Sequence, residues 1–228
     1  MKTNRKAPEN GEGVVLSVRH AGEGGRSVRL FTRTEGKLSF FASRSTLRRC
    51  GAGLLAPFTP LRYSAAPSDY GGILTQYEGR AFFDMTALSY EELAQWYYAV
   101  EIAEQFFPEG QPDGTAYALL LAGAAQGAAR NRTVTAFILS VQLLAAAGSD
   151  PAEEEPMRAL RLSPEGQALL GAFRQWRWEG DFPLRIGRGA FLETARYLDR
   201  FIERYGGVAM KTRGAFLALP AGTGTPSQ

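Results

Sequence analysis

The spacing of apolar residues changes near residue 80, and this change constrains the fold of the 228-residue chain more than any other feature. Before it, short runs of alternating apolar and polar residues are separated by glycine-containing turns, as in β-strands. After it, apolar residues recur every three or four positions, as on one face of a helix. The pattern predicts a mostly β domain followed by a helical one.

Five short strands are expected in the first part, and they cover residues 13–19, 27–32, 38–42, 58–65 and 73–78. In the first of them, alternation predicts that Val14, Leu16 and Val18 point inward. Five strands in so short a segment fit a small closed barrel of the OB-fold type. The expected fold class is therefore mixed all-β plus all-α. It comprises a flexible N-terminus (1–12), an OB-fold domain (13–80), a helical domain (81–219) and a flexible tail (220–228).

Helix starts are marked by capping residues. Ser89 with Glu92 three positions later forms a capping-box pattern, Asp113 can cap a second helix, and Ser163 precedes a proline at a first helical position. The first expected helix begins after Ser89. Further helices are expected over residues 116–130, 133–147, 164–178, 192–205 and 210–219. The glutamates at 153–155, between two prolines, are interpreted as a solvated linker.

Charge is distributed unevenly between the two parts. Residues 1–80 carry 13 Lys and Arg against 6 Asp and Glu, a balance of +7, whereas residues 81–228 carry 13 against 17, a balance of −4. A basic β module on an acidic helical body suggests a head that binds nucleic acid on a support that binds protein.

Catalytic and metal-binding patterns are absent from the sequence. The chain has one histidine, His20, and one cysteine, Cys50, too few for a structural zinc site or an internal disulfide. A nucleophile pair of these two residues has no supporting signature, and no phosphate-binding loop is present. We expect no enzyme activity, no metal and no cofactor. The N-terminus lacks the apolar core of a secretory signal and no apolar run is long enough for a membrane span, so a cytoplasmic protein is expected, at the nucleoid when bound to DNA.

The candidate DNA-binding residues are basic side chains and one aromatic ring, all before residue 50: Arg26, Arg29, Phe31, Arg33, Lys37, Arg44, Arg48 and Arg49. Strand alternation places Arg29, Phe31 and Arg33 on one face, where a ring between two guanidinium groups could stack on bases. Phe31 could equally pack against a neighbouring element. Residues 43–49 are interpreted as a flexible loop that clamps the DNA backbone.

At these residues the chain resembles the RecO family of recombination mediators. The resemblance rests on Gly13-Val14-Val15-Leu16, Gly22-Glu23, Leu30-Phe31-Thr32 followed by Gly36-Lys37, and the segments 54–61 and 198–219. It implies an N-terminal OB-fold, a helical C-terminal domain and no enzymatic turnover. It also implies binding of single- and double-stranded DNA, strand annealing, docking on RecR and on single-stranded-DNA-binding protein, and help in loading RecA. Many relatives carry a four-cysteine zinc module where this chain has the acidic, cysteine-free segment 149–157.

The resemblance also implies a site for the acidic tail of single-stranded-DNA-binding protein. Lys211 and Arg213, beside Phe216 and Leu217, are the first candidate, and Arg130 with Arg132 are the second. Lys211 and Arg213 could instead cap a helix or solvate the surface. Two other functions stay open: an OB-fold module for RNA or a ribonucleoprotein with an unrelated helical domain, and an enzyme whose site is not recognised.

Overall fold

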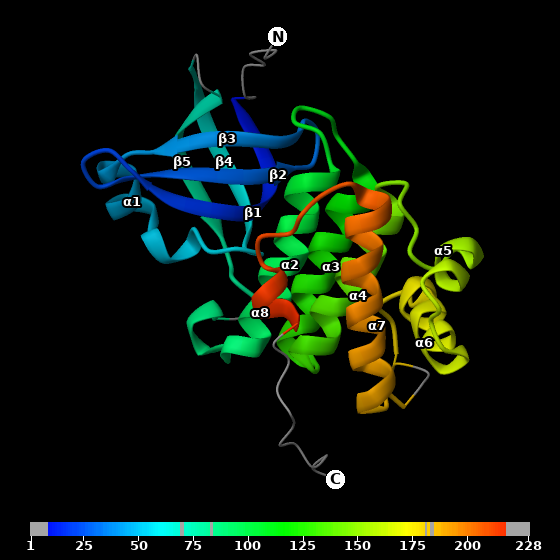
Figure 1. The fold of residues 1–228 in the computed structure, drawn as a ribbon. Helices are drawn as coiled ribbons and strands as arrows, with labels where there is room; N and C mark the ends of the chain where they lie inside the picture. Colours follow the sequence, from blue (N-terminus) through cyan, green and yellow to red (C-terminus); the bar gives the residue numbers. More distant parts are fainter. Residues whose placement is uncertain (1–8, 69–70, 83, 181, 183–184, 218–228) are drawn as a thin grey trace.

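A five-stranded barrel lies against one side of a helical bundle (Figure 1). The computed structural model describes residues 9–68, 71–82, 84–180, 182 and 185–217. The strands are β1 (Asn10–Ala21), β2 (Gly25–Thr32), β3 (Gly36–Ala42), β4 (Pro60–Ser68) and β5 (Gly71–Gly79). The helices are α1 (Arg44–Cys50), α2 (Tyr90–Phe106), α3 (Gly114–Ala129), α4 (Arg132–Ala146), α5 (Glu154–Ala159), α6 (Pro164–Gln175), α7 (Arg188–Phe201) and α8 (Arg213–Leu217).

The barrel closes in the strand order β1-β2-β3-β5-β4. All neighbours are antiparallel except β3 and β5, which are parallel and place Phe41 beside Ile73. This is the OB-fold that the strand pattern predicted. Inward-facing side chains such as Val28, Leu30 and Leu74 fill the barrel.

A β-bulge changes the predicted orientation of side chains in β1. The register with β2 shifts between Val15 and Ser17, because one strand carries an extra residue there. As a result Val15 and Val18 pack into the barrel core, whereas Val14 and Leu16 pack against the helices. The prediction that Val14, Leu16 and Val18 share one face is therefore wrong.

The helix starts follow the predicted caps. Ser89 forms a complete capping box with Glu92, and Asp113 and Ser163 each accept a hydrogen bond from a backbone N–H of the following helix. Several boundaries differ from the predictions: α6 ends at Gln175 rather than at residue 178, and α7 covers Arg188–Phe201 rather than 192–205. Residues 154–159 form α5 rather than a linker, and residues 10–12 of the segment predicted as flexible pair with β4. The predicted tail, 220–228, lies outside the described residues.

The barrel and the helices share one hydrophobic core. Phe31 of β2 packs edge-to-face on Phe107 with ring centroids 5.6 Å apart, and Phe58 packs on Trp96 at 4.7 Å. Val14 and Leu16 belong to the same cluster. The barrel and the helices are therefore joined by a continuous cluster of buried side chains. None of the described helices is both long and apolar enough to cross a bilayer.

Candidate nucleic-acid interface

Three of the predicted DNA-binding arginines lie on a helix, not on the flexible loop predicted for residues 43–49. The N–H of Thr46 donates to Ser43 Oγ at 3.2 Å, which caps α1, and Gly51 ends the helix with a φ of 91°. Thr46 and Leu47 are buried against the barrel. The opposite surface of α1 then carries the exposed Arg44, Arg48 and Arg49 in a fixed arrangement.

The three arginines have different surroundings. Arg49 donates to the backbone oxygen of Thr75 on β5. The aliphatic part of Arg44 packs against Gly24 in the turn between β1 and β2. Neither Arg44 nor Arg48 forms an ion pair with any residue that the structure describes, so both guanidinium groups are available to a polyanion.

Phe31 is not an exposed stacking ring. Its side chain is 0% exposed and belongs to the core shared with the helices. Alternation correctly placed Arg29 and Phe31 on the outer face of the barrel, but the helical bundle covers this end of that face. The alternative that Phe31 packs against a neighbouring element is the one the structure shows.

Lys37 and Arg29 lie at the same contact between barrel and helices. Lys37 is 2% exposed, donates to the backbone oxygen of Glu104 on α2, and lies 3.8 Å from Glu104 Oε2. Arg29 Nε is 2.8 Å from the same carboxylate, and its Nη2 also pairs with Glu109. Burial lowers the pKa of Lys37, and the nearby carboxylates of Glu104 and Glu109 only partly offset this. These cations bind acidic side chains of the protein, so a DNA-binding role for Lys37 is not compatible with its burial.

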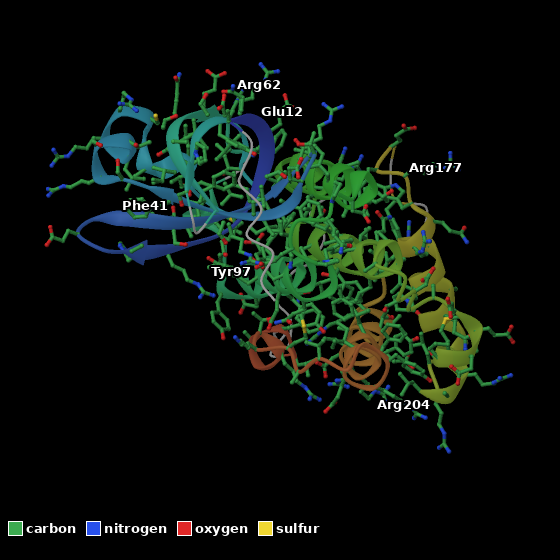
Figure 2. All side chains as sticks on the ribbon, turned by 90° about the horizontal axis from the view of Figure 1, so that it is seen from above. Glu12, Phe41, Arg62, Tyr97, Arg177 and Arg204 are labelled. Carbon is green, nitrogen blue, oxygen red and sulfur yellow. The ribbon has the colours of Figure 1, made fainter. Side chains whose placement is uncertain are left out.

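The remaining two predicted cations are separated from each other. Arg26 donates to the backbone oxygen of Ala52 at 3.4 Å, just beyond α1. Arg33 pairs with Glu12 at 3.3 Å, and Glu12 also pairs with Arg62. Figure 2 shows Glu12 and Arg62 together on one side of the barrel, away from Phe41. Arg26 thus lies near the arginines of α1, whereas Arg33 does not.

Phe41 is an exposed ring that the sequence analysis did not single out. It is 39% exposed, as is its neighbour Ile73 across the parallel β3–β5 pair. Outward positions alternate along β3, so Phe41 lies on the same outer face as Lys37 but beyond the helical bundle. Alternation over Phe40 and Phe41 shows that one ring points outward; the sequence does not show which part of the face stays uncovered.

The first candidate for a peptide site, at Lys211 and Arg213, is part of the internal packing of the C-terminal segment. Arg213 pairs with Asp199 at 2.9 Å and with Glu203 at 3.2 Å. Phe216 is 0% exposed and stacks on Tyr98 with centroids 3.7 Å apart. The Phe216 ring is therefore not available as the apolar lining predicted beside these cations, whereas Leu217 is exposed.

The second candidate includes a real pocket. A cavity of about 580 Å³ lies between the start of α4 and the segment before α7, lined by apolar side chains that include Val134, Ile138, Trp176, Phe182 and Phe191. Arg130 and Arg188 also line it, and the Arg130 guanidinium lies over the Trp176 ring, 5.4 Å from its centroid. Arg132 does not line this pocket and lies 3.8 Å from Glu92.

The structure gives no sign of a metal centre in the part of the chain that it describes, where no three His, Cys, Asp or Glu side chains are grouped suitably. Cys50 is a half-buried free thiol at the end of α1.

Comparison with known proteins identifies the barrel. Residues 7–82 match the family model described as "Recombination protein O N terminal". Two curated proteins named "DNA repair protein RecO" are also similar. That of Pelotomaculum thermopropionicum is 31% identical over 113 residues, covering 48% of this chain and 43% of that protein. That of Desulforudis audaxviator is 29% identical over 192 residues, covering 80% of this chain and 75% of that protein.

The barrel segment therefore matches the N-terminal domain of RecO proteins. The matched segment contains all of the described barrel strands together with α1. It also includes Phe41, Arg44, Arg48 and Arg49. The similarity to the Desulforudis RecO protein covers 80% of this chain and so extends beyond the barrel into the helical part.

Proposed function

We propose that this protein is a recombination mediator in DNA repair, which binds DNA through the barrel and α1 and anneals complementary strands. The observation that carries this proposal is the exposed group of Arg44, Arg48 and Arg49 on α1 of an OB-fold that matches the RecO N-terminal family model. Similarity to relatives that are named DNA repair proteins favours DNA over RNA.

Annealing has a simple physical basis at such a surface. Two DNA strands repel each other, and a cationic surface lowers that repulsion while condensed counterions are released. Contacts to the backbone suffice, because base pairing between the strands supplies the specificity. Single- and double-stranded DNA both fit this mode of binding.

The α1 arginines provide the test. The triple variant Arg44→Glu, Arg48→Glu, Arg49→Glu should weaken DNA binding and slow annealing of strands coated with single-stranded-DNA-binding protein. The dependence of log affinity on log salt should become shallower by about 0.7 for each lost phosphate contact on single strands. The matched control reverses three exposed arginines of the helical part, Arg158, Arg196 and Arg204, and changes the total charge equally.

Unchanged DNA affinity in the α1 variant, measured by fluorescence anisotropy, would refute the assignment. An RNA competitor of the same sequence that displaces DNA at equal concentration would instead favour the RNA-binding alternative.

The helical part is proposed to bind protein partners. The pocket beside Arg130 combines an apolar lining with cationic side chains, which suits the acidic, hydrophobic tail of single-stranded-DNA-binding protein. Docking on RecR and help in loading RecA, both implied by the family, complete the proposal. RecA filament assembly on coated single strands, measured with and without RecR, tests them.

Variants of Arg130 and Arg132 test whether the tail of single-stranded-DNA-binding protein binds in this pocket. Arg130→Ala should weaken binding of a tail peptide roughly fivefold, since one partly exposed charge contact contributes about 1 kcal/mol. Arg132→Ala, which changes a residue outside the pocket, should leave peptide affinity unchanged. Equal losses in both variants, measured by calorimetry, would refute this location. A loss only in the double variant Lys211→Ala, Arg213→Ala would return the site to α8.

A further inference from the structure

The outer face of β2, β3 and β5 is covered unevenly. Its end near the bundle carries Phe31 and Lys37, both buried against the helices. Its middle carries Arg29, which pairs with Glu104 and donates to Ser39 Oγ at 3.4 Å. Its far end carries Phe41, which is 39% exposed and lies on the barrel away from the helical bundle (Figure 2).

The exposed apolar surface at this far end is continuous across strands. Phe41 pairs with Ile73 on one side and with Ser27 on the other. Both apolar side chains are 39% exposed, whereas Phe31 on the same outer face is fully buried.

The Phe41 ring lies against the backbone of Gly25 on β2. A Cβ placed on Gly25 would lie 2.5 Å from Phe41 Cζ and 2.6 Å from Cε2, so the ring edge rests directly over the glycine backbone. Only glycine leaves room for this contact. A ring held in this way loses little conformational freedom when a ligand stacks on it.

Two arginines lie near the ring, on the side of the β1–β2 turn. Arg19 is in register with Ser27, which is in register with Phe41, so Arg19 lies about 10 Å away across two strand spacings on the same face. Arg44 packs against Gly24, the residue next to the glycine under the ring. Arg19, Arg44 and Arg48 are exposed and have no ion-pair partner among the described residues, and Glu23 at the β1–β2 turn is the nearby acid in sequence.

We infer that Phe41, supported by Ile73, is a stacking platform for an unpaired base, and that the nearby arginines Arg19 and Arg44 hold the flanking phosphates of a single strand. This inference rests on the proposed DNA-binding function and adds a contact that duplex DNA cannot make. Bases in a duplex are already stacked and paired, whereas every unpaired base offers a flat face to an aromatic ring. The face therefore distinguishes single strands from duplex by chemistry that salt does not screen.

The test uses the full chain and three probes of equal length: oligo-dT, an abasic strand with the same phosphates, and a duplex. Phe41→Leu keeps an apolar side chain over Gly25 and removes only the flat ring. It should lower oligo-dT affinity roughly tenfold, the loss of one stacked base, with an unchanged salt slope. Affinity for the abasic strand and the duplex should stay the same. Tyr90→Ala, which removes a 64% exposed ring at the start of α2, is the control and should change none of the three.

A second measurement follows the ring itself. In a Phe41→Trp variant, oligo-dT should quench indole fluorescence and the abasic strand should not, while oligo-dT affinity stays at or above that of the natural chain. Unchanged oligo-dT affinity in Phe41→Leu would overturn the inference, and so would equal losses on all three probes. The α1 triple variant distinguishes a failure of this inference from a failure of the proposed function. If the triple variant loses affinity for all three probes while Phe41→Leu keeps its affinity for all three, the proposed DNA binding holds and the stacking platform is refuted.

Discussion

Lys37 illustrates at the scale of one residue how the contact between barrel and helices changes the behaviour of a charged group. Its ammonium group is buried beside Glu104, with Arg29 and Glu109 nearby. Removal from water disfavours the protonated form and lowers the pKa from its ordinary value of 10.5. The repulsion from Arg29 acts in the same direction, and the two carboxylates act against it.

The lowered pKa of Lys37 predicts that the free energy of unfolding depends on pH. Between the lowered pKa of the folded state and 10.5, the unfolded chain binds a proton that the folded chain has lost, so the Lys37 contribution to the free energy of unfolding rises with pH. Compared with a Lys37→Met variant, the natural protein should gain stability between about pH 8 and about pH 10. Urea denaturation of both proteins at the two pH values measures the difference, in which the tyrosine titrations common to both cancel. A difference that stays constant or falls would contradict the lowered pKa.

At the scale of elements, α8 is held by a side chain from a helix far away in sequence. Glu101 of α2 accepts hydrogen bonds from the backbone N–H groups of Lys211 and Thr212, at 2.7 and 2.9 Å, and from Thr212 Oγ1 at 2.7 Å. Gln95 of the same helix donates to the backbone oxygen of Phe216 at 3.3 Å. A helix as short as α8 is not stable alone, so these contacts and the stacking of Phe216 determine its position.

We expect Glu101→Ala to destabilise the protein by about 1–3 kcal/mol, because it leaves partly buried N–H donors without an acceptor. Gln105→Ala, on the exposed side of the same helix, is the control and should cost less than about 0.5 kcal/mol. Chemical denaturation measures both. Equal effects of the two variants would show that Glu101 does not hold α8.

At the scale of the whole molecule, the shared core makes the barrel and the helices one folding unit. Phe58 adopts a φ of 63°, an uncommon conformation for a residue with a side chain, and is 2% exposed against Trp96. Barrel residues Val14, Leu16 and Phe31 belong to the same cluster. A barrel separated from the helices would expose all of these side chains to water.

Cooperative unfolding is the expected consequence. Thiol labelling of Cys50 reports on the barrel, and the fluorescence of the three tryptophans, all in the helical part, reports on the helices. Both should show one transition at the same denaturant concentration. Phe58→Ala should lower both midpoints together, with a loss of about 3–5 kcal/mol. Two separated transitions would show that the parts unfold independently.

The sequence by itself determined the local structure, because strand alternation, helical spacing and caps act over a few residues. Ser89, Asp113 and Ser163 cap the helices that the pattern predicted, and the five strands form the expected OB-fold. Local pattern missed α1 and the bulge after Val15, since both depend on burial against the barrel and on the register with a neighbouring strand.

Only the tertiary structure decided which outward side chains remain exposed. Strand alternation predicts only that Phe31, Lys37 and Phe41 all point outward from neighbouring strands. The helical bundle then covers Phe31 and Lys37 and leaves Phe41 exposed. Phe31 packs on Phe107, the residue after α2, and Lys37 pairs with Glu104 of α2. Both partners lie far along the chain, so a local sequence pattern does not show which residues they cover. The sequence therefore predicted a basic, DNA-binding barrel. The packing of that barrel on the helices determined which ring a base could reach.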